Sequence, residues 1–124
     1  ILDFENKNIL EFEKIISSFN YKSTLPVSLN SLIDPAKREQ LKKEKNLIAF
    51  SYYNSFQNLM SIDILMNSPL SFKEMWTQRE VRKVEGTDIN LVSVDHLIEM
   101  KKYSDRIQDR QDIVQLKKYR SEKG

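Results

Sequence analysis

Residues 47–66 of the chain are LIAFSYYNSFQNLMSIDILM. Apolar side chains fill 47–53 and return in 59–66, and the polar segment between them contains two asparagines. Short apolar runs separated by turn-forming residues are typical of a β-hairpin. We therefore predict antiparallel strands over 47–53 and 59–66. Because side chains alternate along a strand, Asp63 should face away from Ile62 and Ile64.

The segments before this hairpin predict one short strand between two helices. Apolar residues recur at helical spacing in 8–19, with Asn6 or Asn8 as the expected N-cap. They are Ile9, Phe12, Ile15, Ile16 and Phe19. Residues 21–29 alternate loosely around Pro26, which indicates an edge strand. Asp34 and Pro35 then predict the start of a helix over 35–45.

The segments after the hairpin predict a short helix, two strands and two further helices. The helix over 71–78 carries Met75 and Trp76, both expected in the core. Strands are expected at 80–84 and 89–92 around a turn at 85–87. A helix capped by Ser93 should run to about 104, and the last should run from 108 or 109 to about 119.

This order of elements predicts an α/β (α+β) fold. We expect one domain over residues 1–124, with a mixed β-sheet flanked by helices and a C-terminal helix pair. No apolar run approaches the roughly 18 residues of a membrane helix, so no membrane association is expected. The first residue is Ile1 rather than methionine, and we expect the sequence to be part of a longer protein.

Composition excludes several kinds of functional site. The chain has no cysteine, one histidine and two glycines. Thiolate zinc sites, disulfides, P-loops and glycine-rich dinucleotide loops are therefore impossible within it. The absence of cysteine fits a reducing cytoplasm. His96 is expected to be an exposed surface residue.

Basic residues gather in two segments of the chain. They lie in 35–45 and in 117–123. A solvated face is one interpretation, and contact with a nucleic-acid backbone is the other. The net charge of +2, from 20 basic and 18 acidic residues, gives the second little support.

Charged residues interrupt the apolar stripes of the last two predicted helices. Lys101 continues the apolar stripe of its helix, and Asp109 and Asp112 lie along the apolar edge of the next. Buried charges are costly unless they are paired or used. One interpretation is that ion pairs lock the two helices together. The other is a site in which Lys101 and Arg106 meet phosphate oxygens.

Asp63 also allows two interpretations. It could be a solvated strand position, which is the ordinary consequence of alternation. It could instead be a carboxylate that holds a divalent metal ion near phosphate.

Residues 91–116, LVSVDHLIEMKKYSDRIQDRQDIVQL, resemble the closing motif of a known enzyme family. The family is that of the minimal nucleotidyltransferases of the DNA polymerase beta-like superfamily, which includes abortive-infection and toxin–antitoxin proteins. Its pattern begins with Ser, a hydrophobic residue, Asp or Glu, any residue and Leu-Ile, and a Lys follows after two residues. An Arg then follows after four residues, an Asp after two and a second Asp after two more, and the pattern ends with a hydrophobic residue and a Leu. The matching positions are Ser93, Leu97, Ile98, Lys101, Arg106, Asp109, Asp112, Ile113 and Leu116.

The resemblance extends upstream, with one departure. Residues 61–65, SIDIL, are similar to the family's strand that bears its third metal carboxylate. The family also opens with a Gly-Ser pair followed by Asp-x-Asp, and neither motif occurs here. We expect both to lie before Ile1, so the chain is expected to be truncated at its N-terminus and inactive alone.

The resemblance implies an activity and roles for individual residues. A nucleoside monophosphate would pass from a nucleoside triphosphate (NTP) to an acceptor hydroxyl on RNA, protein or a small molecule. Two Mg²⁺ ions would be held by three carboxylates, with Asp63 as the third. Lys101 and Arg106 would bind the nucleotide, and Asp109 and Asp112 would orient them. An antitoxin-type protein partner is also implied.

The alternative is a non-enzymatic role. In that case the chain is a catalytically inactive nucleotidyltransferase-fold module that binds a protein or RNA partner and retains the helix-pair charges as packing.

Overall fold

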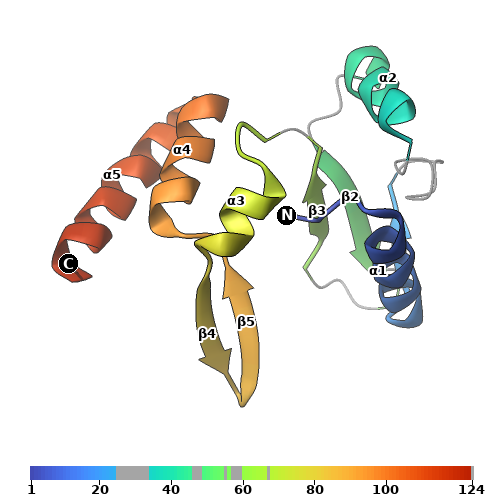
Figure 1. Cartoon of the computed structure of the whole chain (residues 1–124), viewed down its shortest axis with the longest axis horizontal. Helices are drawn as coiled ribbons and strands as arrows, with labels where there is room; N and C mark the ends of the chain where they lie inside the picture. Colours follow the sequence, from blue (N-terminus) through green and yellow to red (C-terminus); the bar gives the residue numbers. More distant parts are fainter. Residues whose placement is uncertain (25–33, 46–48, 55, 57–59, 67, 124) are drawn as a thin grey trace. The chain divides into compact units, whose positions relative to one another are not determined.

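The computed structural model describes residues 1–24, 34–45, 49–54, 56, 60–66 and 68–123. It is an α+β structure that falls into two compact units, Ile1–Asn67 and Ser68–Gly124 (Figure 1). The described strands form one three-stranded and one two-stranded sheet, one in each unit. Among the described residues, no helix has both the length and the apolar character needed to cross a membrane.

The first unit contains a three-stranded antiparallel sheet with strand order β1-β2-β3. Its elements are α1 (Asn6–Ser18), β1 (Tyr21–Ser23), α2 (Pro35–Lys45), β2 (Ala49–Asn54) and β3 (Ile62–Leu65). β2 and β3 confirm the predicted antiparallel pair, with Ser51 opposite Asp63. β1 is an edge strand, as predicted. The predicted strand positions 25–29, 47, 48 and 59 lie outside the described residues.

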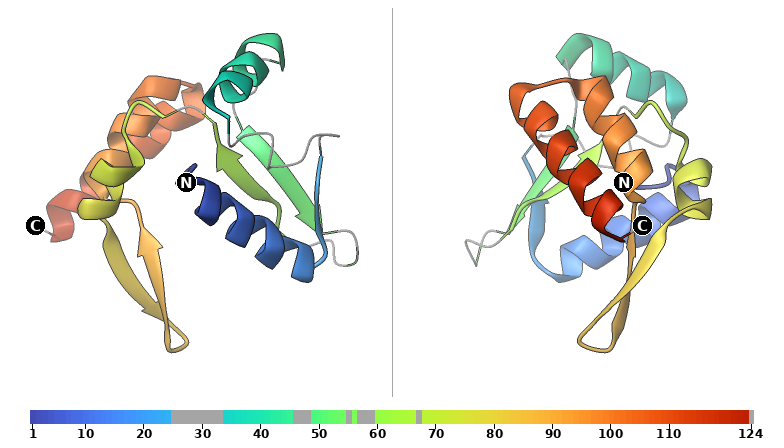
Figure 2. Two further views of the ribbon diagram at one scale, coloured as in Figure 1. Left: turned by 45° about the vertical axis from the view of Figure 1, so that its right-hand side comes forward. Right: turned by 90° about the vertical axis from the view of Figure 1, so that its left-hand side faces the viewer.

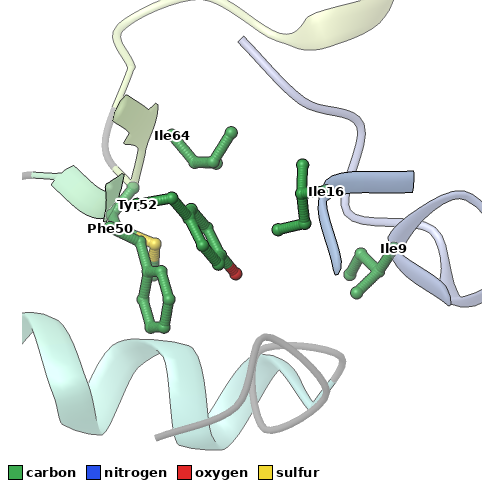
Figure 3. Packing of buried hydrophobic residues seen from close by; sticks show 6 residues of the cluster. Ile9, Ile16, Phe50, Tyr52 and Ile64 are labelled. Carbon is green, nitrogen blue, oxygen red and sulfur yellow. The ribbon is translucent and has the colours of Figure 1, made fainter. Parts of the chain in front are cut away.

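The core of the first unit lies between α1 and one face of this sheet (Figure 3). Phe50 and Tyr52 are two residues apart on β2, so both point to the same face. Their ring centroids are 5.3 Å apart, and Phe12 of α1 meets Tyr52 edge-on at 6.0 Å. The buried residues are Ile9, Ile16, Phe50, Tyr52, Ile64 and Met66.

Two details of α1 differ from the sequence prediction. Its N-cap is Glu5, which makes no side-chain capping bond, and the Asn8 amide instead donates to the Asp3 carbonyl at 2.9 Å. Ile15 and Phe19 belong to the predicted apolar stripe but are 52% and 65% exposed. The described core covers a narrower arc of the helix than the stripe does. The Asp34 cap is confirmed, because its carboxylate accepts from the backbone N–H of Ala36 at 2.9 Å.

The second unit consists of three helices and a hairpin, seen from two further sides in Figure 2. Its elements are α3 (Phe72–Thr77), β4 (Glu80–Val84), β5 (Thr87–Leu91), α4 (Val94–Ser104) and α5 (Ile107–Lys123). Ser93 caps α4 as predicted, accepting from the His96 backbone N–H at 3.2 Å. Compared with the prediction, β5 begins two residues earlier and α5 extends further at both ends.

The hairpin β4–β5 forms a sheet of its own. Glu85 and Gly86 have φ angles of 49° and 80°, as the two central residues of a type I′ turn require. A two-residue turn can only join antiparallel strands. All described strand pairs are antiparallel, and the strands form two separate sheets. The sequence predicted a single mixed sheet instead.

Two side chains lie in environments that the sequence did not predict. Met75 is buried as expected, but its neighbour Trp76 is 44% exposed. Adjacent helical residues point about 100° apart, and here Met75 points into the core while Trp76 lies at its margin. The Trp76 ring is covered instead by the Arg79 guanidinium at 3.9 Å. His96 is half-buried rather than exposed, and its Nδ1 has no hydrogen-bond partner among the described residues.

Candidate functional site

The junction of α4 and α5 carries a cluster of charged side chains, which we call the junction cluster: Lys101, Arg106, Asp109 and Asp112. α4 ends at Ser104, and the chain reverses direction at the C-cap residue Asp105, whose φ of 48° is left-handed. Lys101 lies in the last turn of α4, and Asp109 lies in the first turn of α5. Asp109 and Asp112 are three residues apart, so both carboxylates share the face of α5 that meets α4.

Asp109 is the centre of the cluster and is only 1% exposed. Its Oδ2 accepts three hydrogen bonds: from the Ser104 hydroxyl at 2.8 Å, the Arg106 backbone N–H at 3.0 Å and Arg106 Nε at 2.8 Å. Its Oδ1 lies 3.3 Å from Arg106 Nη2 and 3.5 Å from Lys101 Nζ. A buried carboxylate needs such compensation to stay charged.

Lys101 lies between the two carboxylates of α5. Its Nζ donates to Asp112 Oδ2 at 2.7 Å, and Asp112 Oδ1 accepts from Gln108 Nε2 at 2.8 Å. The Lys101 side chain is 22% exposed. The junction cluster therefore holds two cations and two anions and has no net charge.

The hydrogen bonds keep the cluster ionised. Arg106 and the Ser104 hydroxyl hold the pKa of Asp109 well below its usual range, against the opposing effect of burial. Lys101 and Gln108 lower the pKa of Asp112 in the same way. The bonds to Asp109 raise the pKa of Arg106. Asp109, Asp112 and Arg106 consequently remain charged at neutral pH.

Arg106 is the most accessible member of the cluster. Its side chain is 76% exposed, although Nε and Nη2 are bonded to Asp109. Nη1 has no partner among the described residues, so a planar donor edge of the guanidinium remains open to an anion. Arg106 immediately precedes Ile107, the first residue of α5, and the free backbone N–H groups at this end of the helix also favour negative charge.

The structure thus brings together the four residues that the sequence singled out in the C-terminal helices. Two residues that donate hydrogen bonds to the cluster, Ser104 and Gln108, were missed by sequence reasoning. Ser104 contacts Asp109 only because the chain reverses at Asp105, and no periodic pattern signals such a reversal. Gln108 precedes Asp112 by four residues on α5, a spacing at which helical side chains meet.

Asp63 lies on β3 in the first unit, opposite Ser51. Its side chain is exposed, whereas Ile62 is half-buried and Ile64 is buried, so the predicted alternation is confirmed. Within the part of the chain that the structure describes, no group of three His, Cys, Asp or Glu side chains could hold a metal ion. Asp63 supplies one of the three carboxylates that the resemblance implies for a magnesium site.

Comparisons with models of protein families, with curated proteins and with solved structures found no match. The nucleotidyltransferase resemblance therefore rests on residues 91–116 and 61–65 alone.

Proposed function

We propose that this protein contributes to nucleotidyl transfer, moving a nucleoside monophosphate from an NTP to an acceptor hydroxyl. The observation that carries the proposal is the convergence of Lys101 and Arg106 on the buried Asp109. Burying a carboxylate in order to hold an exposed arginine is costly, and such arrangements concentrate at functional sites. The same four residues are among the charged positions of the closing motif.

Each member of the junction cluster has a role in this proposal. Arg106 binds the triphosphate through its open guanidinium edge, as planar donors bind phosphate oxygens. Asp109 fixes the direction of that guanidinium by accepting from Nε and Nη2. Lys101 adds a second cation, and Asp112 holds it in place at 2.7 Å.

The remaining parts of the proposal follow from the resemblance. The acceptor is RNA, a protein or a small molecule, and an antitoxin-type protein is the proposed partner. Asp63 is the proposed third ligand of a two-Mg²⁺ site. The cytoplasm is the proposed location, because a chain without cysteine suits a reducing compartment.

A second candidate is supported by the neutrality of the junction cluster. Lys101 Nζ is bonded to Asp112 and lies near Asp109, so both carboxylates have a cation without any ligand. In this alternative the cluster only locks α4 to α5. The protein is then a catalytically inactive module that binds a protein or RNA partner.

Nucleotide binding distinguishes the two candidates. ATP, GTP, CTP and UTP would each be titrated into the chain with Mg²⁺, while the backbone amide signals of α4 and α5 are followed by NMR. Arg106→Gln is compared with the matched control Arg110→Gln. Arg110 also donates two hydrogen bonds to one carboxylate, from Nε and Nη2 to Asp105 at 2.8 and 3.1 Å. The two arginines are similarly exposed, at 76% and 67%.

The proposal predicts that only Arg106→Gln weakens nucleotide binding. Loss of a hydrogen bond between charged groups should lower the affinity about 10- to 100-fold. Arg110→Gln should change it less than about twofold, because an exposed ion pair away from the ligand adds little. Equal affinities in both variants, or no binding by the unaltered chain, would contradict the proposal. Either result would favour the alternative, a catalytically inactive module that binds a protein or RNA partner.

A further inference from the structure

One face of the hairpin β4–β5 carries three partly exposed apolar side chains beside Glu80 and Arg82. Val84, Ile89 and Leu91 lie on the same face, because directly paired residues share a face and alternate residues repeat it. Their exposed fractions are 50%, 39% and 42%. Figure 2 shows the hairpin extending beyond the helices of its own unit. A two-stranded ribbon is only marginally stable by itself, so this hairpin would gain from further pairing.

The turn determines which backbone groups face outward. In a two-residue turn the flanking residues, here Val84 and Thr87, form a hydrogen-bonded pair. Bonded and non-bonded pairs alternate along an antiparallel ladder. On β5, the backbone N–H and C=O groups of Asp88 and Asn90 therefore point away from β4. Among the described residues, no third strand pairs with this sheet.

The two outer edges of the hairpin differ in charge. β4 carries Arg82 and Lys83 beside Glu80, whereas β5 carries Asp88 as its single charged residue. Lysine on an edge strand is a common obstacle to further pairing. If two copies of β4 met antiparallel about Arg82, the two arginines would lie directly opposite each other. Like charges in that position are destabilising.

A second copy of β5 fits the β5 edge without such a conflict. Antiparallel pairing centred on Ile89 places Asp88 opposite Asn90 of the second copy, and Asn90 opposite Asp88 of the second copy. Both residues direct their N–H and C=O groups outward, so the two pairs exchange four hydrogen bonds. Ile89 then faces Ile89 of the second copy in the closer, non-bonded type of pair, where apolar side chains stabilise a sheet.

We propose that the protein self-associates through the β5 edge, joining two hairpins into a four-stranded antiparallel sheet with Ile89 at its two-fold axis. Such an isologous contact closes on itself and gives a dimer.

The edge is tested by sedimentation equilibrium with two matched proline variants. Asp88→Pro removes an outward N–H of β5, and Lys83→Pro removes the corresponding group of β4. Both variants lose the same exposed ion pair, Lys83 with Asp88 at 3.8 Å. Asp88→Pro should raise the dimer dissociation constant at least about tenfold, while Lys83→Pro leaves it within about threefold. A monomeric unaltered chain, or equal weakening by both variants, would overturn the proposal.

A charge-swap experiment tests the register and does not depend on proline tolerance. Ile89→Lys and Ile89→Glu should each be monomeric, because each places like charges opposite one another at the axis. Mixing the two variants should restore a dimer, since opposite charges then meet. Far-UV circular dichroism confirms that each variant is folded. A mixture that stays monomeric, or single variants that still dimerise, would show that Ile89 does not face its own copy.

Discussion

Ile15 and Ile16 are adjacent isoleucines on α1 with very different surroundings. Ile16 is 4% exposed and belongs to the core, whereas Ile15 is 52% exposed. Ile16→Ala removes three buried carbons, and at about 0.8 kcal/mol for each, with a cavity cost, it should destabilise the first unit by about 3 kcal/mol. Ile15→Ala should cost less than about 1 kcal/mol, because half of its surface is already solvated and alanine favours the helix.

The difference is measured by urea unfolding followed by NMR on the amide signals of α1 and β2. Trp76, the single tryptophan, lies in the second unit, so its fluorescence reports that unit separately in the same samples. A unit of this size is stable by about 3–10 kcal/mol, so the loss in Ile16→Ala is readily detected. Equal losses in the two variants would refute the placement of α1 on the sheet.

Two further predictions concern the second unit. The pKa values of Asp105, Asp109 and Asp112 lie below the ordinary 3.8, so protons bind the unfolded chain more readily than the folded one. The stability that these carboxylates contribute should be complete above pH 3.8 and be lost as the pH falls below it. Chemical denaturation should therefore unfold the unit more easily at pH 2 than at pH 6, and equal ease at both would contradict this. Lys101→Met should lower the thermal midpoint by about 4–8 °C, because it leaves a buried carboxylate short of a cation. Lys102→Met removes only an exposed pair with Glu99 at 3.3 Å and should change the midpoint by less than about 2 °C, which scanning calorimetry can distinguish.

Local rules in the sequence determined the elements and several of their ends. The alternation of Ile62, Asp63 and Ile64 predicted which side chain would be exposed, because a strand turns successive residues to opposite faces. Ser93 predicted the start of α4, because its hydroxyl can reach an N–H three residues on. The positions of Lys101, Asp109 and Asp112 beside apolar stripes predicted that they would meet, since buried charges need partners.

The tertiary structure alone decided which residues of each apolar stripe are buried and which groups hydrogen-bond to the junction cluster. Ile15 and Ile16 have the same chemistry in the sequence, and only the position of the sheet beside α1 separates a buried side chain from an exposed one. Ser104 reaches Asp109 because the chain reverses at Asp105, and the left-handed conformation there leaves no periodic trace in the sequence. Periodicity describes one element at a time, whereas burial and side-chain convergence depend on what lies opposite that element.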